Sequence, residues 1–271
     1  MLSYLHSFHA GCLADVHKHG LLSLLLTKLC EKDRPLSYME THGGRGLYDL
    51  QSKESNITKE AEHGILALKE SLTARLPSDH PYLRALTWCE QEYGQMMYPG
   101  SPLIAHHILR ANDHLHFMEL HPQEIKHLKQ NMKHNNCHVH FRDGYEGVLA
   151  ISPPKARRGL VLIDPSFEVK QEYETCVSFM AKLHKKWPEA CIVLWYPLLH
   201  SEHYKSMLKK LADLNFQKHQ HYQWVFSQSR EGDHKDQSEK GMKGTGLFIV
   251  NCPWGIENEL LGFHNSVKEF V

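Results

Sequence analysis

The chain has 271 residues, enough for one or two domains that bury a hydrophobic core. Its hydrophobic content of 41% and charged content of 23% are typical of a globular protein, which excludes extensive disorder. Lys and Arg together number 31, as do Asp and Glu, so the composition excludes a uniformly basic, nucleic-acid-binding surface. An anionic partner would have to be held by local patches of positive charge.

No segment of the sequence resembles a membrane anchor or an export signal. The longest apolar run, Leu21–Leu26, is interrupted by Ser23 and is far shorter than the ~18 residues that span a bilayer. The N-terminus has no basic segment followed by an apolar stretch. The seven cysteines include no C-x-x-C pair, which fits a reducing compartment. We therefore expect a cytoplasmic protein.

The 23 histidines are a compositional excess. Histidine pairs spaced by two residues place both rings on one face of a strand, as a zinc site would require. Four such pairs occur: His17/His19, His114/His116, His138/His140 and His219/His221. No H-E-x-x-H motif and no cysteine pair completes a ligand set, so we expect scattered histidines and no dedicated metal site.

The N-terminal part of the chain predicts a helix, a strand and a glycine-rich turn. After a polar, turn-like segment over residues 1–12, leucines at helical spacing predict an amphipathic helix over Leu13–Cys30. A short strand, Leu36–Glu40, then runs into the turn Thr41-His42-Gly43-Gly44-Arg45-Gly46. Residues 47–98 show no strong strand signal and predict helices over 60–76 and 80–93, split at Pro77-Ser78. We interpret residues 47–98 as a small helical insertion.

From residue 99 onward, predicted strands and helices alternate. The expected helices cover residues 102–110, 122–134, 144–151, 170–187 and 202–213, and the expected strands cover 114–120, 138–142, 160–163, 190–195, 219–227 and 246–252. Such alternation predicts an α/β fold with a doubly wound, mostly parallel sheet that is covered on both faces. No helix separates the last two strands, so we expect them to form a terminal antiparallel hairpin with a polar, mobile loop over 229–243. The predicted domains are 1–46 with 99–271, and the inserted helical subdomain 47–98.

Ligands of open α/β sheets bind outside the carboxyl ends of the strands. At these ends the sequence places Glu40 with the glycine-rich turn, Glu119, Asp143-Gly144, Asp164-Pro165-Ser166-Phe167 and Trp195-Tyr196-Pro197. Glycines let the backbone approach a ligand closely, and a carboxylate after the second strand is placed to bind ribose hydroxyls. An Asp-Pro-x-aromatic tetrapeptide after a very apolar strand is typical of amino-group methyltransferases that use S-adenosylmethionine. The same tetrapeptide also suits a type I turn.

The whole chain resembles the RlmJ family of bacterial 23S ribosomal RNA adenine-N6 methyltransferases. The resemblance runs from Met1 to about Trp254 and is most specific at the N-terminus, in Met1–Gly11, Ala14-Asp15-Val16 and Lys18-His19. The other matching segments are Thr41–Gly46, Tyr98–Pro102, Glu119–Pro122, Asp143-Gly144, Arg157–Leu160, Ile163–Pro165 and Leu194–Pro197. The resemblance implies an enzyme with a Rossmann-like class I methyltransferase core, with S-adenosylmethionine as cofactor and S-adenosylhomocysteine as product.

The resemblance also implies roles for individual residues. The implied cofactor contacts are His19, His42, Ser101, Glu119, Asp143, Gly144 and Asp164. Asp164 is also implied as the catalytic residue, and Tyr4 as a contact to the RNA substrate. The family's Asp-Pro-Pro-Tyr is Asp164-Pro165-Ser166-Phe167 here, so one ring and one hydroxyl are lost. We expect the aromatic face to be kept and the turn to be less rigid.

Methylation of an adenine amine explains why these residue types are needed. The Asp164 carboxylate and the Pro165 carbonyl would accept the hydrogens of the amine, and Phe167 would stack on the extruded base. Lys18, between His17 and His19, is the predicted phosphate contact. Further candidate cations are Lys126, Lys129 and Lys133, for which a solvated helix face is the simpler interpretation, and Arg157-Arg158. With no net charge, we expect naked or partly assembled 23S rRNA as the partner and salt-sensitive, modest affinity.

Alternative functions stay open at the level of sequence. The change to Ser166 and Phe167 could mark a catalytically weak or inactive module that binds cofactor and RNA. The target adenine could also belong to DNA or to another RNA, since the Asp-Pro-x-aromatic motif recurs across substrates. A metal-dependent hydrolase is a more distant third alternative.

Overall fold

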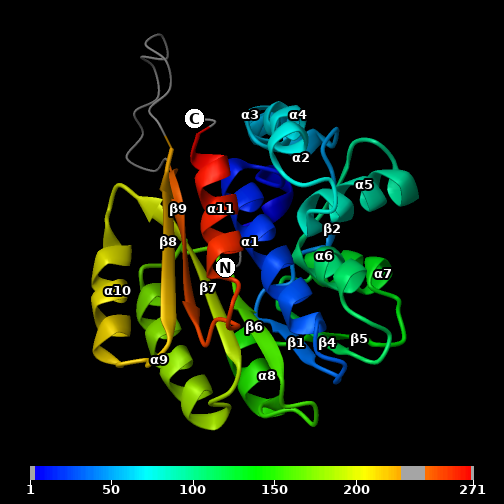
Figure 1. Ribbon diagram of the computed structural model, residues 1–271. Helices are drawn as coiled ribbons and strands as arrows, with labels where there is room; N and C mark the ends of the chain where they lie inside the picture. The colour runs from blue at the N-terminus through cyan, green and yellow to red at the C-terminus, as the bar shows by residue number, and fades with distance from the viewer. Residues whose placement is uncertain (1–3, 227–241, 270–271) are drawn as a thin grey trace.

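A mixed seven-stranded sheet forms the centre of the computed structural model, which describes residues 4–226 and 242–269 (Figure 1). The strand order is β5-β4-β1-β6-β7-β9-β8. The parallel strands are β1 (Ser37–Glu40), β4 (His114–Glu119), β5 (Cys137–Phe141), β6 (Gly159–Ile163) and β7 (Cys191–Leu199). The antiparallel strands are β8 (His219–Val225) and β9 (Met242–Val250), which pair with each other while β9 also pairs with β7. The predicted doubly wound sheet and its terminal antiparallel hairpin are confirmed.

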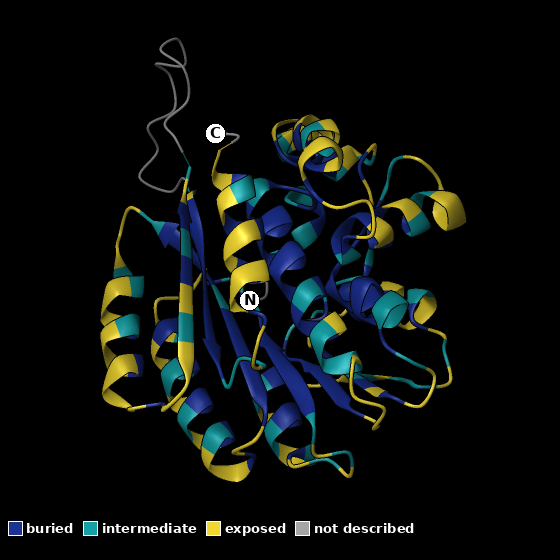
Figure 2. Ribbon diagram, viewed as in Figure 1, coloured by how far each residue is buried: buried dark blue, intermediate teal, exposed yellow. Residues whose placement is uncertain are grey.

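Helices cover both faces of this sheet, and each face has its own hydrophobic cluster (Figure 2). One cluster includes residues of α1 (Leu13–Cys30), α6 (Ser101–Ile108), α7 (Glu124–Asn131) and α11 (Glu257–Lys268). The other includes residues of α8 (Gly144–Ile151), α9 (Gln171–Lys186) and α10 (His203–Asp213). The central strands β1 and β6 are buried along their whole length, as expected for parallel strands packed on both faces.

Helix α1 differs from the amphipathic surface helix that its leucines predict. Its residues from Ala14 to Ser23 are all buried, polar ones included. The reason is α11, which the sequence analysis did not predict and which packs against α1 together with α5 (Pro81–Tyr93), α6 and β9. Gly20 allows this contact, because a Cβ atom there would lie 1.8 Å from the ring of Phe263 in α11.

The insertion is helical as predicted, with two differences. It contains α2 (Lys53–Thr58), α3 (Glu60–His63), α4 (Ile65–Arg75) and α5, and an antiparallel pair of short strands, β2 (Leu47–Asp49) and β3 (Met97–Pro99), closes its base. The helix predicted over 60–76 is broken at Gly64, where the Ile65 N–H donates to the carbonyl of Gly11 at 2.8 Å. Side chains of α4 and α5 share one hydrophobic cluster with α1, and the division of the chain into a core domain and a subdomain stays a prediction.

Two other boundaries move relative to the sequence expectation. Strand β7 continues to Leu199, so Trp195-Tyr196-Pro197 lies within the strand and not after it. Strand β9 begins at Met242, and residues 229–241 of the predicted mobile loop lie outside the described residues.

The N-terminal segment contains a short 3-10 helix, η1 (His6–Phe8). In the part of the chain that the structure describes, no helix is long and apolar enough to cross a membrane.

The close packing at Gly64 predicts that one added methyl group destabilises the folded protein. A Cβ atom at Gly64 would lie 2.0 Å from the backbone oxygen of Gly11, which cannot move without displacing the N-terminal segment. We expect Gly64→Ala to lower the free energy of unfolding by about 1–3 kcal/mol, as measured by urea denaturation. Gly262→Ala is the matched control, because a Cβ atom there meets nothing within 4 Å in helix α11; it should be neutral or slightly stabilising. Equal effects of the two substitutions would contradict this account.

Candidate active site

A cavity of about 990 Å³ opens at the carboxyl edge of the parallel strands. Its walls come from the N-terminal segment, α1, the glycine-rich turn after β1, and the segments that follow β4 and β6, with strand β7 contributing Trp195. This volume lies at the upper end of the range of ligand sites, large enough for a nucleoside cofactor together with a base. Most of the predicted site residues line it, namely Tyr4, Lys18, His19, His42, Ser101, Glu119, Asp164, Pro165 and Phe167.

Asp143 and Gly144 do not contribute to this lining. The Asp143 carboxylate caps helix α8 by accepting the N–H of Glu146 at 2.9 Å. Gly144 lies against the end of β1, where a Cβ atom would be 1.9 Å from the carbonyl oxygen of Thr41. Both residues therefore support the wall of the site in this structure, and their contact with a cofactor stays a prediction.

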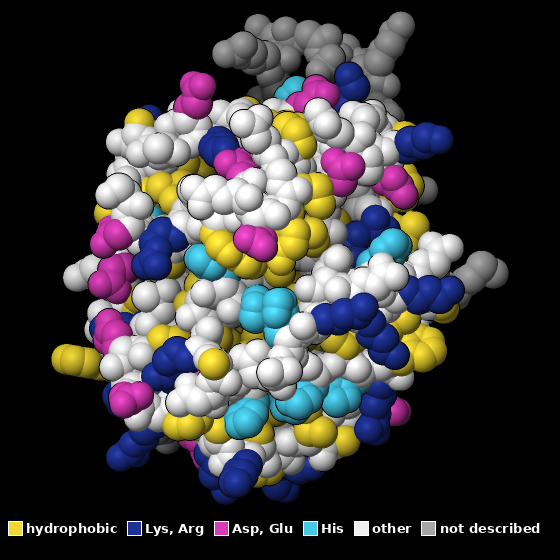
Figure 3. All heavy atoms as spheres, turned by 90° about the vertical axis from the view of Figure 1, so that its right-hand side faces the viewer, with side chains coloured by type: hydrophobic (Ala, Val, Ile, Leu, Met, Phe, Trp, Pro, Cys, Tyr) yellow, Lys and Arg dark blue, Asp and Glu magenta, His cyan; other side chains and the backbone are white. Residues whose placement is uncertain are grey.

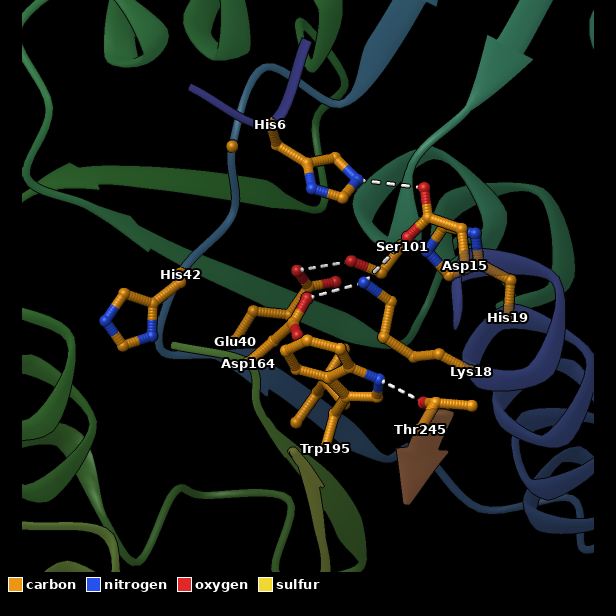
Figure 4. A network of polar contacts seen from close by, with 12 residues as sticks. His6, Asp15, Lys18, His19, Glu40, His42, Ser101, Asp164, Trp195 and Thr245 are labelled. Carbon is orange, nitrogen blue, oxygen red and sulfur yellow. Dashed lines mark hydrogen bonds and ion pairs between the residues drawn. The ribbon is translucent and has the colours of Figure 1, made fainter. Parts of the chain in front are cut away.

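At the centre of the site a buried lysine lies between two carboxylates (Figure 4). Lys18 Nζ is 2.7 Å from Asp164 Oδ2 and 3.0 Å from Asp15 Oδ1, and it lies 5.5 Å from the centre of the Trp195 ring. Only 4% of the Lys18 side chain is exposed, against 15% for Asp164. Burial opposes the charge on Lys18, but the two carboxylates outweigh it and raise the pKa of the lysine well above its usual value. The Asp164 carboxylate is thereby fixed by one oxygen, and among the described residues Oδ1 has no hydrogen-bond partner.

Asp15 is a site residue to which the sequence analysis assigned no role. It accepts hydrogen bonds from His6 Nε2 and from the Gly11 N–H, both at 2.9 Å, in addition to its ion pair with Lys18. Burial alone would raise the pKa of this carboxyl, but His6, Lys18 and His19 together hold it well below the usual range. The signal for this residue was its place in the N-terminal motif. Only the fold shows that it connects the N-terminal segment to Asp164 through Lys18.

Glu40, which the sequence places at a strand end without assigning it a role, is completely buried behind Ser101, a residue of the cavity wall. It accepts hydrogen bonds from the Tyr38 hydroxyl at 2.6 Å and from the Ser101 hydroxyl at 2.9 Å. Burial raises the pKa of Glu40 to about 8, against the effect of these two donors. Ser101, a predicted cofactor contact, is therefore positioned by Glu40 at the beginning of α6.

The glycine-rich turn is held between the ends of β1 and β4. The Gly43 N–H donates to the carbonyl of Met118 at 2.9 Å, and the Gly44 N–H donates to Glu119 Oε2 at 2.8 Å. Gly44 has φ of +60°, and a Cβ atom there would lie 2.4 Å from the Tyr48 hydroxyl. A bidentate ion pair between Arg45 and Glu124, with N···O distances of 3.0 and 2.7 Å, fixes the turn against α7.

Two neutral histidines form further parts of the wall. Burial lowers the pKa of His42 to about 4, and its Nδ1 lies 2.8 Å from the Thr41 hydroxyl. Burial likewise lowers the pKa of His19 to about 3, and its Nδ1 lies 2.8 Å from the Tyr98 hydroxyl. At neutral pH both rings can donate or accept one hydrogen bond without bringing charge into the cavity.

The N-terminal segment closes one side of the cavity. The Tyr4 hydroxyl lies 2.9 Å from His6 Nδ1, and the Tyr4 ring stacks on His9 with a centroid distance of 5.5 Å. His9 Nδ1 in turn lies 2.7 Å from Glu60 Oε1 in α3. The segment is therefore attached both to the helical insertion and, through Asp15, to the charged centre of the site.

Phe167 lines the cavity, and its ring also packs inside the protein. Its ring is 4% exposed and packs against Tyr173 with a centroid distance of 4.6 Å, while its φ of +54° is unusual for a bulky residue. A phenylalanine ring has no hydroxyl to keep in water, so burial of the ring offsets the cost of this backbone conformation. Stacking on a base stays a prediction.

Several of the predicted phosphate contacts have partners inside the protein. His17, Lys18 and His19 are all buried in α1, and none presents its side chain on the outer surface. Arg158 donates to the backbone carbonyls of Leu29 and Arg34, at 2.5 and 3.0 Å. Arg157 and Arg158 precede β6, so they lie at the amino edge of the sheet, opposite the cavity.

The other candidate ligands lie away from the cavity. Lys126, Lys129 and Lys133 are exposed on and just after α7, as the solvated-face interpretation predicts. Within residues 4–226 and 242–269, no group of three or more His, Cys, Asp or Glu side chains is arranged to hold a metal ion.

The last strand of the sheet, β9, is antiparallel and lies beside β7, and the cavity opens at the carboxyl edge of the parallel strands. These features define an S-adenosylmethionine-dependent methyltransferase of the Rossmann-like class. The family model described as "Ribosomal RNA large subunit methyltransferase D, RlmJ" matches residues 33–270. The chain belongs to this family.

Individual relatives agree with this assignment over nearly the whole chain. "Ribosomal RNA large subunit methyltransferase J" of Escherichia coli (strain K12) is 36% identical over 263 residues, which cover 96% of this chain and 90% of that protein. The protein of the same name from Haemophilus influenzae is also 36% identical, with the same coverage. A crystal structure of protein LPL1258 from Legionella pneumophila superimposes with a TM-score of 0.83 at 32% identity, covering 97% of this chain and 94% of that one.

The buried carboxyl group of Glu40 predicts that the stability of the protein depends on pH. Because the pKa of Glu40 is about 8 in the folded protein and about 4.3 in an unfolded chain, the folded state holds an extra proton between these values. The stability from this group is present below the unfolded pKa and is lost as pH rises through 8, by at most about 1.4 kcal/mol per pH unit. We expect Glu40→Gln, which carries no titrating proton, to become increasingly stable relative to the wild type from pH 5 to pH 8.

Urea denaturation of both proteins across this pH range measures the difference, in which all other titrating groups cancel. A difference in free energy that does not change with pH would show that Glu40 is charged in the folded state.

Proposed function

We propose that this protein transfers a methyl group from S-adenosylmethionine to N6 of an adenine in 23S rRNA. One observation carries the proposal: the Asp164 carboxylate lies at the cavity wall beside Pro165, held by Lys18 through Oδ2 only. Membership in the family of ribosomal RNA large subunit methyltransferases supports an RNA substrate. The names of the Escherichia coli and Haemophilus influenzae relatives support the large ribosomal subunit as its source.

The donors and acceptors along the cavity suit the cofactor. Glu119 would bind the ribose hydroxyls with the acceptor capacity that remains beside its two backbone donors, Gly44 and His121. Ser101, His42 and His19 would supply uncharged polar contacts, with Asp143 and Gly144 beside the end of β1. When bound, S-adenosylmethionine supplies a methyl group that is activated by the positive charge of its sulfonium.

The acceptors at the reacting nitrogen account for catalysis. An adenine amine is a poor nucleophile because its lone pair is delocalised into the ring. Asp164 Oδ1 would accept one hydrogen of the amine and the Pro165 carbonyl the other, which favours a pyramidal nitrogen whose lone pair faces the methyl group. The negative charge of Asp164 would stabilise the positive charge that develops on the nitrogen, and the same carboxylate is the nearest acceptor for the proton released.

Lys18 and Asp15 would keep Asp164 in this position. The ammonium group of Lys18 lies 2.7 Å from Asp164 Oδ2, and Asp15 provides the second negative charge that the buried lysine needs. The Trp195 ring forms a cation–π contact with the Lys18 ammonium group. The ring is fixed by the hydrogen bond from its indole N–H to the Thr245 hydroxyl at 2.7 Å. The reacting geometry would thus be set before substrate binds, which is the source of most of the rate enhancement in such in-line transfers.

The target base would have to leave its helix to reach this wall. Extrusion costs a few kcal/mol and least for an unpaired base, so a loop of naked or partly assembled rRNA is the expected form of the substrate. Tyr4 and Phe167 both line the cavity. Tyr4 would contact the RNA, and Phe167 would stack on the base.

Incubation of the protein with unmodified 23S rRNA and labelled S-adenosylmethionine tests the activity directly. After nuclease digestion, we expect the label in N6-methyladenosine. A parallel reaction with duplex DNA should give none. Cofactor binding without transfer, even in a single-turnover reaction, would indicate a binding module and contradict the proposal.

Asp164→Asn tests the role of the carboxylate with little change in shape. Removal of its charge should lower kcat by about 100-fold or more while S-adenosylmethionine still binds. Asp213→Asn, on the exposed face of α10, is the matched control and should leave kcat unchanged. Turnover of Asp164→Asn within a few-fold of the wild type would remove Asp164 from the mechanism.

A further inference from the structure

A cluster of aromatic side chains lies outside the active-site cavity, on the flank of the molecule formed by α5, α6 and the segment after α7. The Trp88 ring stacks on His107 with a centroid distance of 4.6 Å and contacts the edge of Tyr93 at 5.7 Å. The preceding residue of α6, His106, stacks on His134 with a centroid distance of 3.6 Å. Figure 3 views this flank and shows histidine side chains gathered across its middle and lower part. None of these residues lines the active-site cavity.

Between α5 and α6 the cluster borders a groove of about 280 Å³. It is lined by Ser78, Arg84, Thr87, Trp88, Gln91 and His107. Residues 84, 87, 88 and 91 are three or four positions apart, so they share one face of α5. The groove therefore combines a planar aromatic wall with a guanidinium, an amide and two hydroxyl groups. Its size is that of a single planar group, since sites for drug-sized ligands begin near 300 Å³.

The charges of the groove favour a stacking site with a single cation. Burial lowers the pKa of His107, and the nearby guanidinium of Arg84 lowers it further. Burial and the adjacent histidines 134 and 107 lower the pKa of His106 to about 4. Both imidazoles are therefore neutral at physiological pH and add no charge to the groove. Arg84 is exposed, forms no ion pair with another described residue, and supplies the positive charge.

An aromatic wall beside an arginine is the arrangement by which proteins hold single-stranded nucleic acid: bases stack on the rings and the cation contacts a phosphate. We propose that this groove binds one unpaired nucleotide of the RNA substrate at a distance from the methylated adenine, with its base on Trp88 and its phosphate on Arg84. The inference rests on the proposed function for the identity of the RNA. It also gives the helical insertion a role, because α5 supplies the aromatic wall and α6 of the core supplies His107.

Binding of an octamer of uridine, measured by fluorescence anisotropy, tests the groove without methyl transfer. We expect Trp88→Ala to weaken binding by about fivefold or more, and Trp88→Phe to retain most of the affinity. Arg84→Glu should also weaken binding and should reduce the dependence of affinity on salt. Because Arg84 is exposed, this variant should fold normally and keeps the test valid if Trp88→Ala is unstable. With a 23S rRNA fragment as substrate, the variants should raise KM for the RNA with kcat and KM for S-adenosylmethionine unchanged.

Trp254→Ala is the matched control, because Trp254 is 91% exposed and lies outside the groove. It should bind the uridine octamer like the wild type. Wild-type affinity in both Trp88→Ala and Arg84→Glu would overturn the inference while leaving the methyltransferase proposal intact. Loss of uridine binding in both variants, together with no methyl transfer by the wild-type protein, would support the groove and contradict the methyltransferase proposal instead. If the variants keep their affinity for RNA and lose only methylation of ribosomal particles, the groove belongs to a protein contact, and the inference fails.

Discussion

The ion pair of Lys18 with Asp15 and Asp164 is the interaction on which the organisation of the site depends. A lysine that is almost fully buried is stable in its charged form only when opposite charges replace the water it has lost. One carboxylate comes from the same helix, and the other from the end of β6, far away in the sequence. The electrostatic requirement of a single side chain therefore joins α1 to the carboxyl edge of the sheet, and it leaves Asp164 with one oxygen directed to other partners.

The need to pair buried polar groups also explains why α1 is an unusual helix. Its polar residues cannot face water, because α11, α5 and α6 cover the side that is not on the sheet. They are paired inside the protein instead, His17 with His264 at 2.9 Å and His19 with Tyr98 at 2.8 Å. The N-terminal segment is held through Asp15 and through the bond from Ile65 N–H to Gly11. Core, insertion and N-terminus thus meet at one helix, which is why the active-site wall is assembled from segments far apart in the sequence.

Local patterns predicted many of the elements well. Helix α1 and helix α8 have the predicted bounds, and the parallel strands lie within a few residues of their expected positions. The misses have a common cause in packing. The helix over 60–76 breaks at Gly64 because the chain there approaches Gly11, and β2 and β3 are strands of three residues each that form because they close the insertion. Such contacts depend on residues distant in sequence, which no local periodicity contains.

For the site, the sequence by itself determined the class of chemistry: strand-end residues in a fixed order, a glycine-rich turn, and a motif set that marks the methyltransferase family. Those features are readable because each is a contiguous run with its own backbone requirement. Only the tertiary structure decided that Lys18 is paired with two carboxylates inside the protein, that Asp15 lines the site with Glu40 bonded to Ser101 behind it, and that Phe167 is buried. Burial and charge pairing depend on how segments distant in the sequence pack together, so they arise only when the chain has folded.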